Sequence, residues 1–168
     1  DVYKRQLPVA APTQEREPSH RAFPKLIEKW DIERIKKDFA DASERMKAAG
    51  VDGVEIHNAN GYLLHEFMAA SSNKREDEFG GSPENRWRLP EMVIRAVVEE
   101  IGADRVGVRF SPAHNVQGVI EDDQEDMLAT YGGLLDALAP LNLAYVSLLH
   151  GEPESELIAQ LANRARAN

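Results

Sequence analysis

Apolar residues recur every three or four positions after residue 31, the spacing that places side chains on one face of an α-helix. The members of this face are Ile32, Ile35, Phe39, Ala42 and Met46. Asp31 is suited to cap the start of this helix, and Gly50 is suited to end it. Residues 7–30 hold four prolines and no sustained period, which predicts an extended arm or loop.

Three short apolar runs predict β-strands at residues 53–56, 105–111 and 143–149. The helices predicted between and after these strands have apolar faces formed by Met92, Val93, Ala96 and Val97, by Met127, Leu128, Tyr131, Leu134, Leu135 and Leu138, and by Leu157, Ile158 and Leu161. Helices that alternate with strands imply parallel strands joined by crossover connections.

Capping residues set the expected bounds of these helices. Ser82 can cap the first of them with Pro83 at its first helical position, and Pro90 is expected to break or kink it early. Asp122 or Asp123 can open the next helix.

Three parallel strands fit either an open doubly wound sheet or part of an eightfold barrel. Barrel enzymes assemble their sites at the carboxyl ends of the strands, where this chain places His57, Arg109, Ser111, Ser147 and His150. No glycine-rich phosphate-binding fingerprint follows any predicted strand. We therefore predict an α/β fold, a partial (β/α)8 TIM barrel with about three central parallel strands and their helices.

Composition bounds the class of protein. The chain has 168 residues, of which 42% are hydrophobic, enough for one domain. Its net charge of -9 argues against a nucleic-acid partner, and the absence of cysteine excludes disulfides and suits the cytosol. No apolar run approaches the roughly 20 residues of a membrane span, so we expect a soluble, cytoplasmic protein with no membrane partner.

The start of the chain has a separate interpretation. Residues 1–6 look like the translation of a sequencing adapter, and the chain does not begin with Met. We expect these six residues to be a scar, and residues 31–168 to be an incomplete barrel segment from a longer gene. A complete barrel takes about 250 residues.

The turn after the first predicted strand carries the candidate chemistry. His57 and Asn60 can offer two N–H donors to one oxygen, as an oxyanion hole does, an effect of about 3 kcal/mol per donor. The phenol of Tyr62 holds its proton at neutral pH and can release it to a carbanion. This arrangement predicts the substrate side of a reductase site.

Three blocks in order resemble a known family. They are His57-Asn-Ala-Asn60-Gly-Tyr62-Leu-Leu, Ser72-Asn-Lys-Arg75-Glu-Asp77-Glu-Phe-Gly-Gly81-Ser-Pro-Glu-Asn85-Arg86 and Val106-Gly-Val-Arg109-Phe-Ser-Pro112. Over roughly residues 31–150 the chain resembles the Old Yellow Enzyme family of flavin-dependent ene-reductases, and three ordered blocks are more specific than any one alone.

The resemblance implies FMN as cofactor, NAD(P)H as co-substrate and an activated alkene, such as an enone, enal or nitro compound, as the small-molecule partner. It assigns His57 and Asn60 to the pair that binds the activating oxygen of the substrate. Tyr62 matches the proton donor of the family, and Arg109 matches the arginine that contacts the flavin ring. The chain would supply about the fourth to sixth strands of the barrel.

Each site residue also has a plain structural interpretation. His57 and Asn60 can satisfy backbone groups of their own loop, and Tyr62 can be a core residue with its OH in solvent. Arg109 can form an internal ion pair with Glu55, which would also be able to fix it beneath a flavin.

The other polar and aromatic residues are interpreted as structural. The loop residues Arg75, Asp77, Asn85 and Arg86 are expected to brace loops and cap helices. No metal site is predicted, so His65, His114 and His150 are assigned surface or loop positions. Trp30, Trp87 and Tyr145 are expected to pack, although Tyr145 lies on a predicted strand and could approach the site.

Two other functions stay open. One is the dienoyl-CoA reductase branch of the same family, some members of which have a second His at the position of Asn60 and carry an iron-sulfur cluster; Asn60 favours the simpler enzymes. The other is a non-catalytic, incomplete barrel that is unable to hold FMN. Homo-oligomer formation and the choice between NADH and NADPH also stay open.

Overall fold

The computed structural model describes residues 10–14, 24–151 and 155–167, so the predicted scar at residues 1–6 lies outside the described residues. The elements are β1 (Ala10–Ala11), β2 (Lys25–Leu26), α1 (Lys29–Ala48), β3 (Val54–Asn58), α2 (Leu63–Met68), α3 (Pro83–Ile101), β4 (Val106–Phe110), α4 (Gln124–Leu138), β5 (Tyr145–Leu148) and α5 (Glu156–Ala167). Single 3-10 turns lie at Ala103–Arg105 and Ala139–Leu141.

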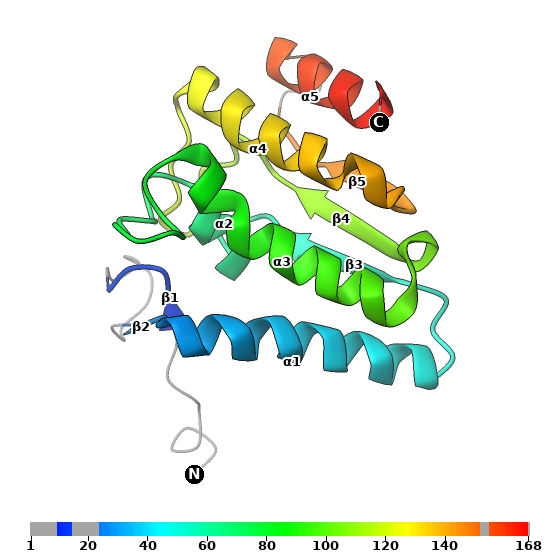
Figure 1. Ribbon diagram of the computed structural model, residues 1–168. Coiled ribbons are helices and arrows are strands. Elements are labelled where there is room, and N and C mark those ends of the chain that lie inside the picture. The colour runs from blue at the N-terminus through cyan, green and yellow to red at the C-terminus, as the bar shows by residue number, and fades with distance from the viewer. Residues whose placement is uncertain (1–9, 15–23, 152–154, 168) are drawn as a thin grey trace.

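The central sheet has the order β3-β4-β5, and both pairs of strands are parallel. The helices α1, α3, α4 and α5 form one layer over a single face of this sheet (Figure 1). A doubly wound sheet would carry helices on both faces, whereas strands in sequential order with helices on one face are the arrangement of a barrel wall. The predicted α/β barrel segment is therefore the fold that is observed.

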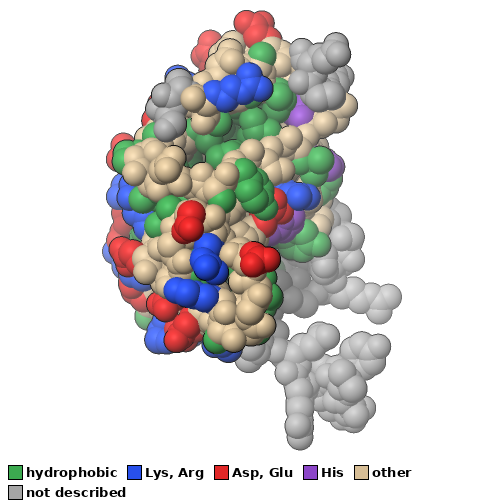
Figure 2. Space-filling view, turned by 90° about the vertical axis from the view of Figure 1, so that its right-hand side faces the viewer, with side chains coloured by type: hydrophobic (Ala, Val, Ile, Leu, Met, Phe, Trp, Pro, Cys, Tyr) green, Lys and Arg blue, Asp and Glu red, His purple; other side chains and the backbone are tan. Residues whose placement is uncertain are grey.

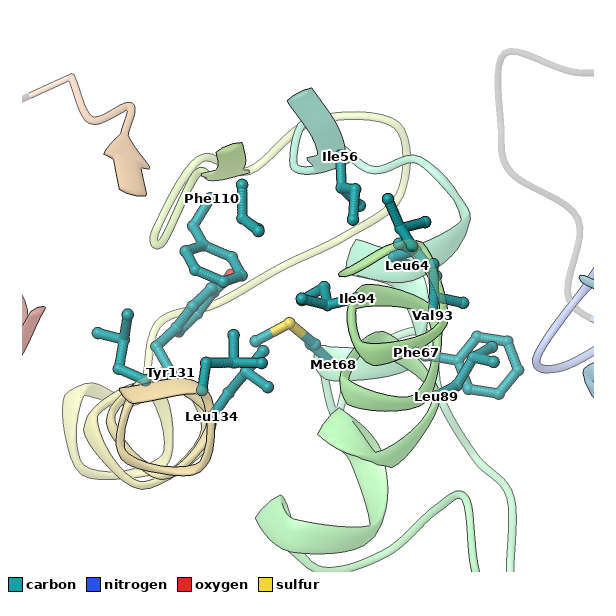
Figure 3. Packing of buried hydrophobic residues seen from close by; sticks show 14 of the residues in the cluster. Ile56, Leu64, Phe67, Met68, Leu89, Val93, Ile94, Phe110, Tyr131 and Leu134 are labelled. Carbon is teal, nitrogen blue, oxygen red and sulfur yellow. The ribbon is translucent and has the colours of Figure 1, made fainter. Parts of the chain in front are cut away.

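The core lies between the sheet and the helix layer. Alternate strand residues point toward the helices, so that Ile56 and Phe110 meet side chains of α2, α3 and α4 (Figure 3). The fully buried members include Leu64, Phe67, Leu89, Val93, Ile94, Val108, Tyr131 and Leu134. The opposite residues of the same strands face away from the helices and are free to form a site.

The first helix begins earlier than the sequence predicts. Its N-cap is Glu28, and Asp31 lies at the third helical position, where its Oδ2 accepts the backbone N–H of Glu28 at 3.0 Å. The prediction of Asp31 as N-cap was therefore wrong, since the N-cap lies three residues earlier. A carboxylate at the N-cap or at the third helical position can accept a free backbone N–H at the helix start, so the sequence alone does not distinguish the two positions. On the predicted apolar face, Ile32 and Ile35 are buried, whereas Met46 is exposed.

The second long helix is continuous through Pro90, so the predicted early break does not occur. Proline removes only the hydrogen bond to the carbonyl of Arg86, and the buried apolar face around Pro90 outweighs that loss. The predicted cap is confirmed, since Ser82 Oγ accepts the N–H of Asn85 at 3.3 Å and Pro83 is the first helical residue.

Three further differences concern short or exposed elements. The sequence did not predict α2, because six residues are too few to show a period. It also did not predict β1 and β2, which have two residues each and lie within the predicted arm. Strand β3 runs to Asn58, two residues beyond its predicted end. Trp30 is 58% exposed rather than packed.

Strand β5 is an edge of the sheet among the described residues, and an apolar cavity of about 490 Å³ lies between it, α4 and α5. Its lining includes Leu135, Leu138, Val146, Leu148 and Ile158. The face drawn in Figure 2 shows hydrophobic side chains gathered in its upper part, and acidic and basic side chains interspersed elsewhere.

Candidate active site

The sheet face that points away from the helices carries a row of polar side chains. Backbone register places His57 of β3 opposite Arg109 of β4, and Arg109 opposite Ser147 of β5. Since side chains two residues apart on a strand share a face, Glu55 and Tyr145 lie on this face too. Sequence reasoning expected His57 after the strand, whereas it lies within β3, next to the last residue.

His57 is grouped with Tyr62. The two ring centroids are 5.0 Å apart with an interplanar angle of 55°. Tyr62 directly precedes α2 and is 52% exposed, so its phenol is open to a ligand. The imidazole of His57 makes no hydrogen bond to any residue that the structure describes, and its N–H is available.

Asn60 is held by its backbone and not by its side chain. Its φ of 56° is left-handed, a conformation that Asn tolerates better than most residues. Its N–H donates to Ser111 Oγ at 2.8 Å, which ties the β3 turn to the end of β4. The side-chain Oδ1 is buried without a partner, and Nδ2 donates to no described residue. The amide nitrogen is therefore free to donate to a ligand.

Arg109 is an anchored cation. Its Nε lies 2.8 Å from Glu55 Oε1, as an ion-pair contact that is not directed along the N–H bond, and its Nη2 donates to Glu55 Oε2 at 3.4 Å. Its side chain is 40% exposed, and Nη1 has no hydrogen bond to a described residue. The predicted pairing with Glu55 is thus present, and it leaves one nitrogen of the guanidinium uncommitted.

Tyr145 completes this ion pair from the neighbouring strand. Its OH donates to Glu55 Oε2 at 3.0 Å, and this hydrogen bond, more than burial or the charge of Glu55, raises the pKa of Tyr145. The ring lies across Gly107, where a Cβ would overlap its Cζ. Tyr145 therefore makes a polar contact at the sheet face, as its expected place on a strand had left open, while its ring covers Gly107.

The loop residues of the second sequence block are structural, as expected. Arg86 is buried and donates to Met68 O at 2.7 Å, to Gly81 O at 2.8 Å and to both oxygens of Asp126. Arg75 pairs with Asp77 and Asn85 bonds the carbonyl of Gly80, so these side chains brace the loop before α3. None of them lies on the sheet face with His57.

Two polar residues that support the turn were missed or misplaced from the sequence. Ser111 was noted only as a polar residue at the end of a strand, although its hydroxyl accepts the N–H of Asn60. His65 was assigned to the surface or a loop, and this was wrong, because it is fully buried in α2 and its Nδ1 accepts the N–H of Gly61 at 2.9 Å. Its polar character alone gave no sign of burial.

Comparison with known proteins identifies the family. A family model described as NADH:flavin oxidoreductase / NADH oxidase matches residues 3–152. The chain belongs to this NADH:flavin oxidoreductase family. A curated family member, enoate reductase 1 of Kluyveromyces lactis, is 44% identical over 129 residues, which are 73% of this chain and 32% of that protein.

Solved structures of this family agree with the fold. Morphinone reductase in complex with tetrahydroNAD superposes with a TM-score of 0.84 and 32% identity, over 92% of this chain and 46% of that one. An old yellow enzyme homologue from Zymomonas mobilis superposes with a TM-score of 0.79 and 30% identity, over 89% and 44% of the two chains. The predicted family and barrel fold are confirmed, and the chain spans less than half the length of these relatives.

The described residues offer neither a membrane-spanning helix nor a cluster of metal ligands. No described helix combines the length and the apolar character that crossing a membrane demands. No three His, Cys, Asp or Glu side chains of the described residues lie together in a way that could hold a metal ion.

Proposed function

We propose that this chain carries the substrate-binding side of an FMN-dependent reductase that acts on activated alkenes. In the net reaction NAD(P)H is oxidised to NAD(P)⁺, and one hydride and one proton add across the C=C bond. The observation that carries the proposal is that the His57 imidazole and the Asn60 amide nitrogen have no hydrogen bond within the described residues while Tyr62 stands 5.0 Å from His57.

The two donors fit the oxygen of an electron-withdrawing group. Negative charge builds on a carbonyl or nitro oxygen as hydride arrives at the β-carbon, and donors fixed in advance stabilise that charge. The plain structural interpretation of His57 and Asn60, satisfaction of their own loop, is disfavoured because Ser111 and His65 already accept the N–H groups of this turn. Asn60 is thereby held in place with its amide nitrogen free.

Tyr62 is the group suited to protonate the α-carbon. A phenol holds its proton at neutral pH and can give it to a carbanion as the charge develops. The contact of its ring with that of His57 supports this role, since it puts the phenol beside one of the two proposed oxygen-binding residues. The other tyrosine of the sheet face, Tyr145, is committed to Glu55 by its hydrogen bond.

The donor set on the sheet face also fits FMN. Arg109 offers an uncommitted Nη1 on a half-exposed guanidinium that Glu55 and, through it, Tyr145 hold in place. A cation in this position would hold an electron-rich edge of the flavin ring. When bound, FMN supplies the centre that takes hydride from NAD(P)H and passes it to the alkene.

The test separates the two half-reactions in the FMN-loaded protein. Tyr62→Phe should leave flavin reduction by NADPH or NADH within about threefold of the unsubstituted protein, since no proton passes from Tyr62 in that step. Reoxidation by cyclohexenone should slow by about 10²–10⁴-fold, the usual contribution of a general acid. Stopped-flow absorbance in the flavin bands measures both steps. Equal reoxidation rates in the two proteins would contradict the proposal.

A further inference from the structure

A buried polar cluster lies beneath the turn that carries Asn60 and Tyr62, and none of the chemistry above uses it. Its members are His65 of α2, Glu121 of the loop before α4, and Tyr131 of α4. His65 and Tyr131 are fully buried, and the Glu121 side chain is 6% exposed. Three buried polar side chains from separate segments need mutual hydrogen bonds, or they destabilise the fold.

Contacts to the carboxylate of Glu121 join these segments. Tyr131 OH donates to its two oxygens at 2.9 and 3.1 Å, and the N–H of Ala113 donates to Oε2 at 3.0 Å. Burial first, and then the charge of Glu121, raise the pKa of Tyr131 well above its ordinary value, so its hydroxyl stays a donor. The third neighbour is His65 Nε2, 3.3 Å from Oε2.

The hydrogen bond from Gly61 fixes the tautomer of His65. Since Nδ1 accepts the N–H of Gly61 at 2.9 Å, Nδ1 carries no proton. The ring proton is then on Nε2, which faces the carboxylate of Glu121 although the contact is less well directed than a full hydrogen bond. His65 thus presents its unprotonated Nδ1 to the N–H of Gly61, and the carboxylate of Glu121 near Nε2 favours that orientation of the ring.

Gly61 has little freedom of its own. Its φ is +72°, and a Cβ at this position would lie 2.7 Å from both Gln117 Cβ and Val116 O. Its backbone therefore packs against the loop after β4 on one side and bonds His65 on the other. Because Gly61 stands between Asn60 and Tyr62, any shift of its peptide moves both side chains.

We propose that His65, oriented by Glu121, is a positioning residue that fixes the Gly61 peptide and so aims Asn60 and Tyr62 at the substrate. This inference rests on the proposed function for its effect on turnover. The hydrogen bond itself can be tested without turnover.

Two variants of His65 divide its two contacts. Asn places its amide oxygen near the position of Nδ1, so His65→Asn keeps an acceptor for Gly61 and loses the contact with Glu121. Gln places its amide nitrogen near the position of Nε2, so His65→Gln keeps the contact with Glu121 and loses the acceptor for Gly61. Both introduce a neutral amide of related size, which matches them as a pair.

Three measurements are made on each protein: hydrogen exchange of the Gly61 amide, the melting temperature, and turnover of cyclohexenone per bound FMN. His65→Asn should keep slow exchange at Gly61 and should retain turnover within about threefold. His65→Gln should exchange Gly61 faster and should lose about 10²-fold in kcat, as expected when reacting groups are misplaced by about 1 Å. The nitrogen NMR spectrum of the unsubstituted protein should show His65 protonated at Nε2 alone.

Two results would overturn the inference: a protonated Nδ1 in that spectrum, or equal Gly61 exchange in the Asn and Gln variants. The inference would also be overturned if both variants lost turnover to the same extent and in parallel with a fall in melting temperature, since that would show a purely structural role for His65. If the unsubstituted protein does not reduce cyclohexenone, the proposed function fails, whereas the spectrum and the exchange rates still test the contact of His65.

Discussion

At the scale of single residues, the site depends on backbone positions that admit few side chains. Asn60 occupies the left-handed region, which Asn tolerates better than most other residues, so its backbone restricts which side chains can stand at this position. Gly107 lets the ring of Tyr145 cross strand β4 and reach Glu55. At positions 60 and 107, therefore, the type of residue decides where the polar groups of Asn60, Tyr145 and Glu55 lie.

Gly107→Ala should detach Tyr145 from Glu55, because the new Cβ would overlap the tyrosine ring. The hydrogen bond to Glu55 is the main cause of the raised pKa of Tyr145, so that pKa should fall toward its ordinary value of 10.0. An ultraviolet titration of tyrosinate, with Tyr145→Phe to identify its contribution, measures the change. An unaltered titration of Tyr145 would show that the ring does not depend on Gly107.

His57, Asn60 and Tyr62 could be picked out from the sequence because they follow an apolar run within six residues, so a local pattern contains them all. The burial of His65 could not, because its neighbours Glu121 and Tyr131 are distant in the chain and only the folded molecule brings them together. For Tyr145 the sequence left packing and an approach to the site both open, because it does not show that the ring crosses Gly107 and reaches Glu55.

At the scale of elements, Arg86 joins three helices. It extends from α3 to the carbonyl of Met68 at the end of α2 and to Asp126 and Thr130 of α4. The helix α2 begins directly after Tyr62, so this contact holds one end of the candidate site against the helix layer. The sequence predicted α1, α3, α4 and α5 from their periods, but six residues of α2 gave no signal.

Arg86→Ala should lower the free energy of unfolding by about 3–5 kcal/mol, because it leaves a buried carbonyl and a partly buried carboxylate without their partner. Lys37→Ala on α1 removes an exposed pair with Asp41, 2.5 Å apart, and should cost much less than Arg86→Ala. Urea denaturation measures both. Similar costs for the two variants would contradict the role given to Arg86.

At the scale of the whole molecule, the polar ends of the three strands were enough to predict a barrel wall rather than a doubly wound sheet. The observed order β3-β4-β5 with helices on one face has that form (Figure 1). The start of α1 was less predictable, since Asp31 lies inside the helix and binds groups that precede it in the chain: Lys25 of β2 at 2.7 Å and the N–H of Glu28. Through these bonds one carboxylate links β2 to α1 of the helix layer.

Acid should destabilise the molecule through Asp31. Burial raises the pKa of this carboxyl, but its hydrogen bonds from Lys25, Glu28 and Arg34 outweigh that effect and leave the pKa below its ordinary value of 3.8. A lowered folded-state pKa means that the stabilisation is present above the unfolded value and is lost as pH falls through the folded value.

Asp31→Asn should therefore reduce the loss of unfolding free energy between neutral pH and a pH below 3.8, measured by denaturation at each pH. Asp122→Asn, at an exposed carboxylate, is the matched control and should keep the full loss. If the two variants show the same dependence on pH, Asp31 does not account for the acid sensitivity.

The most direct test of the account is the rate at which the FMN-loaded protein reduces cyclohexenone after both donors are removed. His57→Ala and Asn60→Ala should each reduce kcat by about 10²–10³-fold, and the double variant by at least as much as either, at unchanged FMN content. Asn163→Ala, at an exposed residue of α5, should keep the rate of the unsubstituted protein. A double variant that reduces cyclohexenone at an undiminished rate would contradict the account.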